Sequence, residues 1–226
     1  MKKMLVLILV LLVSGALPAQ GSRKAFNRNS LLSLHAGPSF PMGVFSSSMP
    51  STDEAGYART GITVGMNYEY RFKNSAGIGG TVFYSQYNTR DLVLNFDFGE
   101  GTQTVTMTMD NWRMYGIALG PTLNFAPVKN VSAGVHIMGG IANVRMPAFY
   151  YDNEEAVKAD WGISPVVQGG LDLKLDAGKQ FFFFVNGEYQ YMKPVFNMFD
   201  IWTDESDKGY QKIAVVNATA GIGFRF

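Results

Sequence analysis

The residues of this sequence that could do chemistry are three acids, three bases and two histidines on the polar faces of predicted strands. They are Glu69, Arg71, Asp172, Lys174, Glu188, Arg225, His35 and His136. Carboxylates beside ammonium or guanidinium groups form ion pairs, and a carboxylate beside histidine can take part in acid–base catalysis. Because acids and bases are equal in number, we expect internal pairing that fills a closed interior. The alternative is a gated pore in which the same pairs are the plug.

These charges are unevenly spaced along the strands that carry them. Five of the six fall toward the ends of their strands that meet the short turns. Glu188 lies farther along its strand and has no evident inward partner. We expect it to pair with a residue of another strand near the outer rim.

The elements that position these side chains are segments of alternating polarity. Between residues 61 and 72, for example, Ile62, Val64 and Met66 alternate with Thr63 and Gly65, which is the period of a strand with two unlike faces. Eight such strands are predicted, at residues 30–40, 61–72, 76–88, 112–125, 131–146, 161–175, 180–192 and 211–226. The β-rich excursion at 89–111 extends a hairpin beyond the sheet, or adds a strand pair that would make ten strands.

The direction of the two faces follows from what each face contains. No charge interrupts the apolar parity in the middle of any strand, as hydrocarbon requires. Charged residues are only 16% of the chain, below the roughly 25% of a soluble domain. The fold class is therefore all-β: a transmembrane antiparallel up-and-down barrel with its apolar face toward lipid.

This arrangement also predicts an aromatic girdle at each membrane interface. The turn-end girdle comprises Phe72, Phe125, Phe181, Phe224 and Phe226, and the loop-end girdle comprises Tyr84, Trp112, Tyr115, Trp161 and Tyr191.

The first 19 residues have the pattern of a cleaved secretory signal peptide. Lys2 and Lys3 precede an apolar run too short to span a membrane. We expect two parts: a signal at 1–19 and a barrel domain at 20–226. Cleavage would leave 17 basic residues against 18 acidic ones, a balance that argues against a nucleic-acid partner. The absence of cysteine excludes disulfides and thiolate metal sites.

The closing segment carries the most specific motif in the sequence. The spacing of Thr219, Gly221, Phe224 and Phe226 resembles the C-terminal signal by which the barrel assembly machinery recognises outer-membrane barrels for insertion. With the GPSFP segment at 37–41, it resembles the small outer-membrane barrels related to the OmpA transmembrane domain. The resemblance implies the outer membrane of a Gram-negative bacterium, both termini in the periplasm, and lipopolysaccharide among the surrounding lipids. The pattern departs from full-length OmpA in that we expect no peptidoglycan-binding domain after the barrel, so wall anchoring is not implied.

Enzyme activity is not expected from this sequence. It contains no GxSxG, HExxH or phosphate-binding glycine pattern. Outer-membrane lipid hydrolases place His, Ser and an acid at the lipid-facing edge, whereas both histidines here have the inward parity. We therefore expect no catalytic residues, no cofactor and no metal site.

The long loops are the remaining candidates for specific contacts. Residues 147–160 are acidic, and residues 193–210 combine acids with four aromatic side chains: Phe196, Phe199, Trp202 and Tyr210. Exposed aromatics mark binding surfaces, whereas the acids alone would only bind divalent cations loosely among lipid headgroups. We expect a non-enzymatic barrel with a packed polar lumen. Its role would be envelope integrity or surface interaction. A protein partner would bind at the loops, or the barrel itself would be an accessory subunit of a larger membrane complex. A narrow solute channel and a lipid-modifying enzyme are the alternatives.

Overall fold

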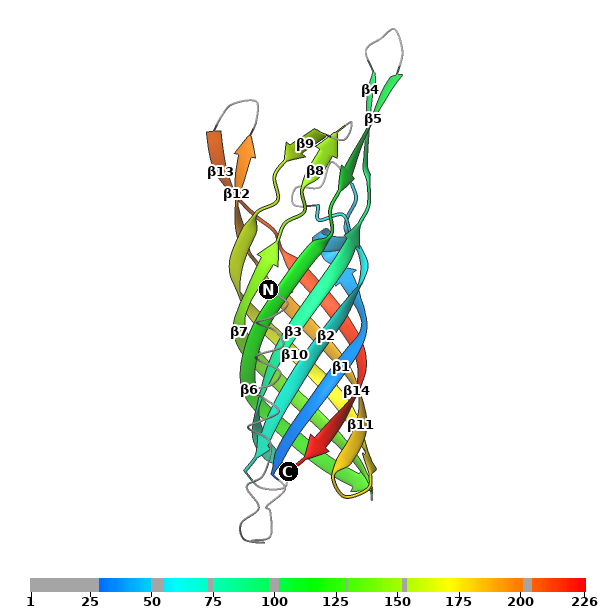
Figure 1. Ribbon diagram of the computed structural model, residues 1–226, viewed down its shortest axis with the longest axis vertical. Helices are drawn as coiled ribbons and strands as arrows, with labels where there is room; N and C mark the ends of the chain where they lie inside the picture. The colour runs from blue at the N-terminus through cyan, green and yellow to red at the C-terminus, as the bar shows by residue number, and fades with distance from the viewer. Residues whose placement is uncertain are drawn as a thin grey trace, which may run out of the picture.

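Eight long strands form a closed antiparallel barrel in the computed structural model (Figure 1). The structure describes residues 29–49, 55–72, 75–97, 102–128, 130–151, 154–200 and 205–226, so the predicted signal peptide lies outside it. The strands are β1 (Ser30–Met42), β2 (Ala58–Arg71), β3 (Ala76–Thr89), β6 (Trp112–Val128), β7 (Val131–Arg145), β10 (Trp161–Ala177), β11 (Phe181–Met192) and β14 (Ile213–Arg225). They follow one another around the barrel in the order β1-β14-β11-β10-β7-β6-β3-β2. The predicted eight-stranded barrel is confirmed.

The β1–β14 seam closes the ring. Leu31 lies opposite Arg225 in this pairing, and Ser39 lies opposite Asn217. Backbone hydrogen bonds also join Ser30 to Phe226, with N···O distances of 3.2 and 3.0 Å. The first and last described strands are therefore as fully paired as any neighbours in sequence.

The excursion after β3 stands outside the barrel wall. Its strands β4 (Leu92–Asp97) and β5 (Thr102–Met109) pair with each other, while β3 pairs directly with β6. The ten-stranded alternative is therefore wrong. With β8 (Phe149–Tyr151) and β9 (Glu154–Val157), they form a four-stranded sheet above one side of the mouth, and β12 (Val195–Asp200) and β13 (Glu205–Tyr210) form a separate hairpin (Figure 1).

The alternation of side chains places apolar residues on the outside. Ile117 is 59% exposed and its neighbour Ala118 is 4% exposed, because successive residues of a strand face opposite sides. The same alternation runs through the barrel strands, with Leu, Ile, Val and Phe outward. The predicted direction of the two faces is confirmed. Within the described residues, no helix has the length and apolar character needed to cross a bilayer.

The residues of the two predicted aromatic girdles lie outward near the ends of the barrel, with one exception. Phe72, Phe125 and Phe181 are exposed at the turn end, and Tyr115 and Trp161 are exposed at the loop end, where their rings lie 5.6 Å apart. The prediction for Trp112 was wrong, because this side chain is buried inside the barrel. Trp112 shares the parity of the inward residues Gly116 and Ala118, and that parity determines its direction.

Glycines on the inner face make room for large side chains from neighbouring strands. A Cβ atom at Gly65 would lie 2.6 Å from Nε2 of His35, and one at Gly223 would lie 2.1 Å from the ring of Phe182. Both distances are below van der Waals contact. Small residues on one strand therefore allow large polar or aromatic residues on the next to cross the lumen.

Candidate functional site

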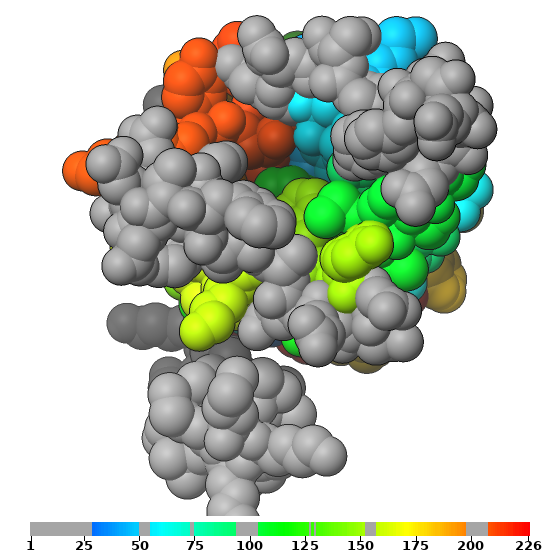
Figure 2. Space-filling view, turned by 90° about the horizontal axis from the view of Figure 1, so that it is seen from above, coloured from blue at the N-terminus to red at the C-terminus, as the bar shows by residue number. Residues whose placement is uncertain are grey.

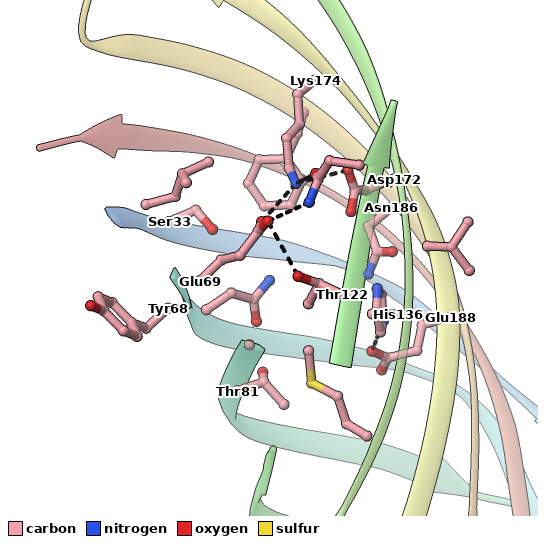
Figure 3. A pocket seen from close by; sticks show the side chains of 18 of the residues that line it. Ser33, Tyr68, Glu69, Thr81, Thr122, His136, Asp172, Lys174, Asn186 and Glu188 are labelled. Atoms are coloured by element: carbon pink, nitrogen blue, oxygen red, sulfur yellow. Dashed lines mark hydrogen bonds and ion pairs between the residues drawn. The ribbon is translucent and has the colours of Figure 1, made fainter. Parts of the chain in front are cut away.

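The turn-side half of the lumen contains an ion-paired cluster, called here the charged cluster: Glu69, Arg71, Asp172 and Lys174, with Asn124. Lys174 Nζ lies 3.0 Å from Glu69 Oε2 and 3.1 Å from Asp172 Oδ2 (Figure 3). Arg71 Nε donates to Glu69 Oε1 at 3.0 Å. Asn124 donates its amide to Glu69 and accepts hydrogen bonds from Lys174 and Arg71.

Each charge in this cluster is buried or half-buried and has an opposite partner from the cluster. Glu69 is 9% exposed and Lys174 is 7% exposed, so an unpaired charge at either position would carry a large desolvation cost. The residues come from β2, β6 and β10, and the ion pair between Lys174 and Glu69 therefore crosses the barrel interior. The structure brings together four of the residues expected to pair, and Asn124 is an addition that its inward parity could have identified.

Arg225 belongs to a second pair nearer the turn end. Its guanidinium Nη2 donates to Asp176 Oδ1 at 2.6 Å, and its Cζ lies 5.0 Å from the centre of the Phe182 ring. The sequence pattern had assigned Asp176 to a turn. The strand β10 instead continues to Ala177, which gives Asp176 the inward parity and a partner on β14.

Glu188 is the centre of a smaller group in the middle of the barrel, called here the Glu188 group. Its carboxylate lies 3.1 Å from His136 Nε2 and accepts hydrogen bonds from Gln168 at 3.1 Å and Asn217 at 3.3 Å. These partners come from β7, β10 and β14. The expectation of a partner on another strand agrees with this geometry. The expected position near the outer rim does not, since Glu188 lies opposite Gly170 near the midpoint of β10.

His35 also points inward but takes part in a different contact. Its ring meets Phe184 edge-on at 6.3 Å between centroids. Its Nδ1 is buried without a hydrogen-bond partner among the described residues. Apart from Arg71 and Asn217, the residues of the charged cluster and the Glu188 group line one small cavity of about 50 Å³, whose wall also includes Asn186 (Figure 3). Phe182 and Phe184 line it as well. Such a volume holds a few water molecules at most.

The loop-side half of the lumen is mainly apolar, with a few buried polar side chains such as Ser39, Ser85 and Gln190, which corrects the expectation of a polar interior along its whole length. A contiguous set of buried side chains, called here the mouth cluster, fills it: Phe45, Ala58, Phe83, Tyr87, Trp112, Met114, Ala118, Met138, Ala142, Val144, Met146, Val166, Met192, Phe196, Ile213 and Val215. In the view onto this end, segments from the early, middle and late parts of the chain meet around the centre (Figure 2).

Loop residues complete the mouth cluster from above. The short 3-10 helix η1 (Gly43–Ser46) places Phe45 between Tyr87 and Trp112, with 5.4 Å between ring centroids in each case. Trp112 also contacts Phe196 at 6.0 Å and donates its indole N–H to Gly56 O at 2.9 Å. The Trp112 side chain therefore holds both Phe45 and Gly56, which lie in the segment between β1 and β2, against the mouth of the barrel.

Backbone contacts strengthen this closure. Tyr57 N donates to Ser47 O, and Tyr57 O accepts from Arg90 N, both at 2.9 Å. Tyr57 has φ of +53°, in the left-handed region that non-glycine residues adopt only when surrounding contacts hold them there. Burial raises the pKa of its phenol.

The four aromatic loop candidates do not form one exposed surface. Phe196 is 1% exposed and belongs to the mouth cluster, so its assignment as a surface residue was wrong. Tyr210 is 42% exposed, and Lys193 Nζ lies 3.5 Å from its ring centre. Trp202 and the side chain of Phe199 lie outside the described residues. In the part of the chain that the structure describes, no group of three or more His, Asp or Glu side chains is arranged to hold a metal ion.

The residues of the proposed insertion signal occupy both faces of β14 and the residue after it. Thr219 and Gly221 have the inward parity, and the rings of Phe224 and Phe226 stack at 6.1 Å. Phe224 also contacts Phe181 on β11 at 5.3 Å. This geometry positions the motif at the turn end, and its recognition by assembly machinery stays a prediction.

Three solved structures that are similar to this chain are remote from it in sequence. Neisserial surface protein A is 10% identical, with 88% of this chain and 97% of that chain covered and a TM-score of 0.50. The chain has the fold of the small outer-membrane β-barrels. Ail, the attachment invasion locus protein of Yersinia pestis, is 16% identical over 87% and 97% of the two chains, with a TM-score of 0.47. The outer membrane protease OmpT of Escherichia coli is 10% identical, with 87% of this chain and 95% of that chain covered and a TM-score of 0.47.

No protein-family model and no curated protein matches the chain. The names of the similar structures describe different roles, so the shared fold leaves the role of this chain to be argued from its own residues.

Proposed function

We propose that this chain is a non-enzymatic outer-membrane barrel whose lumen is closed and whose extracellular loops make its specific contacts. The observation that carries the proposal is the filling of the lumen in two layers. Ion pairs and hydrogen bonds occupy the turn-side and middle parts, and the mouth cluster occupies the loop side. An eight-stranded barrel leaves an interior just wide enough for side chains, so this filling leaves no room for a solute path.

Insertion in the outer membrane is supported by the outer surface. Apolar side chains such as Leu119 and Ile163, 64% and 71% exposed, cover the strands between the two aromatic ends. Exposure of this kind is costly in water and favourable in hydrocarbon. Short turns at one end and long hairpins at the other support an orientation with the loops outside the cell. Both termini would then lie in the periplasm.

A narrow solute channel is the competing function, and conductance distinguishes the two. The purified mature chain, reconstituted in planar lipid bilayers, is expected to give no steady openings at moderate voltage. Regular unitary currents from the wild-type protein would overturn the closed lumen. The matched positive control is a variant that removes a side chain from the mouth cluster, such as Phe45→Ala, and it is expected to conduct.

A lipid-modifying activity is disfavoured by the location of the histidine and carboxylate pair. His136 and Glu188 have side chains only 10% and 14% exposed and lie within the closed middle of the barrel, where a membrane lipid has no access. Incubation of the reconstituted protein with lipopolysaccharide and phospholipids, followed by mass spectrometry, is expected to return the lipids unchanged. A new product that disappears in the His136→Asn variant would refute the assignment.

The loop elements are where we place protein recognition. The four-stranded sheet above the mouth has β4 and β9 as its edges, and unpaired strand edges can accept a further strand from a partner. Crosslinking in native membranes followed by purification of the tagged barrel would identify a partner. Shortening the β4–β5 hairpin is expected to abolish capture, whereas shortening the β12–β13 hairpin is the control. Capture unaffected by either deletion would move the contact away from these loops.

A further inference from the structure

Two arginines lie directly opposite each other on the outer face of the barrel. Arg113 on β6 and Arg145 on β7 are register partners. Both have the outward parity, because Trp112, Met114 and Val144 beside them are buried inside. Like charges directly opposite each other on a sheet repel and destabilise the pairing. Two cations therefore stand side by side in an unfavourable pairing.

The carboxylate near this pair balances only one of the two charges. Asp110 Oδ2 lies 3.3 and 3.4 Å from the two terminal nitrogens of Arg145. Among the described residues, Arg113 forms no ion pair or hydrogen bond through its side chain and is exposed. One guanidinium, with its rigid array of donors, is therefore available to an anion that also reaches Arg145.

The arginines are part of a row that runs across four strands, called here the arginine row. Register pairing places Gln86 beside Arg113, and Trp161 beside Arg145. The next row toward the membrane centre contains Tyr84, Tyr115, Asn143 and Ile163, and the row after that contains Val82, Ile117, Ile141 and Pro165. Polarity thus falls from charged to amphipathic to fully apolar over three rows.

This gradient matches the profile of a lipid from its headgroup to its acyl chains. Tyr and Trp rings favour the interface, and the arginine row, which includes Trp161, lies on the headgroup side of Tyr84 and Tyr115. The amide of Asn143 donates to Tyr115 at 2.7 Å, and its carbonyl oxygen is buried without a partner among the described residues.

We propose that the arginine row binds the phosphate of an outer-leaflet lipid, with the acyl chains lying against the apolar rows below. A pair of guanidinium groups suits a phosphate because each can donate two parallel hydrogen bonds. The inference rests on the membrane insertion proposed above and adds a lipid class and a site to it. The occupant is a phosphate-bearing membrane lipid, and free phosphate is an outcome that the experiment separates.

The test uses the full mature chain in detergent micelles, titrated with diphosphoryl lipid A and followed by native mass spectrometry. The Arg113→Gln variant is expected to bind about tenfold more weakly, the scale of one lost charge-assisted hydrogen bond. Arg59→Gln is the matched control, since it removes the same charge from the loop end of β2, and its binding is expected to stay within about twofold of wild type. An equal loss in both variants would show unspecific attraction and overturn the site.

Three further arms complete the test. Lipid A stripped of its phosphates is expected to lose the dependence on Arg113, and inorganic phosphate alone is expected not to compete. Effective competition by inorganic phosphate would make this an anion site rather than a lipid site. Asp110→Asn releases Arg145, and we expect binding tighter by up to about fivefold, the scale of an exposed ion pair. Unchanged or weaker binding in Asp110→Asn would contradict the role of Arg145.

Insertion is measured separately by heat-shifted electrophoretic mobility and protease protection in vesicles. A wild-type chain that fails to insert would refute the proposed function. A chain that inserts normally but binds lipid A equally well without Arg113 would refute only the arginine row.

Discussion

The two halves of the lumen are filled in contrasting ways by the same eight strands. On the turn side, Glu69, Asp172 and Lys174 neutralise one another through contacts of about 3 Å. On the loop side, Phe45, Trp112 and Phe196 fill the space through ring contacts. The first half depends on exact pairing of charges, since an unpaired buried charge is costly, and the second depends on shape. The difference teaches that alternation determines which side chains point inward, while the inward residues themselves determine how the interior is closed.

The largest effect is expected from breaking the charged half. Lys174→Met leaves Glu69 and Asp172 without their shared cation and should lower the free energy of unfolding by about 3–5 kcal/mol. Urea unfolding of the reconstituted barrel measures this change. Lys179→Met, at the turn between β10 and β11, is the control and should change it by about 0.5 kcal/mol or less. Equal effects of the two substitutions would mean that the charged cluster does not stabilise the barrel.

A somewhat smaller effect is expected from the apolar half. Phe45→Ala removes a fully buried ring and should cost about 3 kcal/mol, at the low end for such a change because a loop can partly collapse. It should also produce conductance in planar bilayers that wild type lacks. Phe40→Ala, which removes an outward ring from β1, is the control for a lost aromatic side chain. A Phe45→Ala barrel that stays silent would show that the closure does not depend on this plug.

The smallest of these effects should come from the Glu188 group between the two halves. Glu188→Gln keeps the shape of the side chain and removes the charge that three donors share, so we expect a loss of about 1–2 kcal/mol. A double-mutant cycle with His136→Asn separates the pair from its surroundings. Thermal stability equal to wild type would leave no reason to distinguish Glu188 from other polar residues of the lumen.

The strands were predictable because alternation is a local property of the sequence. Residues 61–72 alternate cleanly, and β2 spans Ala58–Arg71. The same rule identifies the inward charges. It could not find their partners, because which strand lies across the lumen depends on closure, as the contact between Lys174 and Glu69 from β10 and β2 shows.

The mouth cluster was less predictable because the inward residues lose their polar character there, while the outward residues include charged as well as apolar side chains. Val144, Val166 and Ile213 point inward, but their outward neighbours range from Arg145 and Lys212 to Val167, so the two faces show no consistent contrast in polarity. Phe45 lies in a Ser-rich segment without periodicity, and Phe196 lies in a loop with other aromatics. Only the three-dimensional position of the mouth distinguishes these two rings from exposed ones.

The seam between β1 and β14 has a consequence for biogenesis. Leu31 and Arg225 are paired across nearly the whole polypeptide, so the ring is an open ribbon with two hydrogen-bonding edges until the final strand arrives. Loop-closure entropy makes such distant pairing slow, and hydrocarbon penalises unpaired backbone by several kcal/mol per group. Zipping of this last seam and entry into the bilayer should therefore be one concerted event, during which the nascent ribbon needs shelter from other chains.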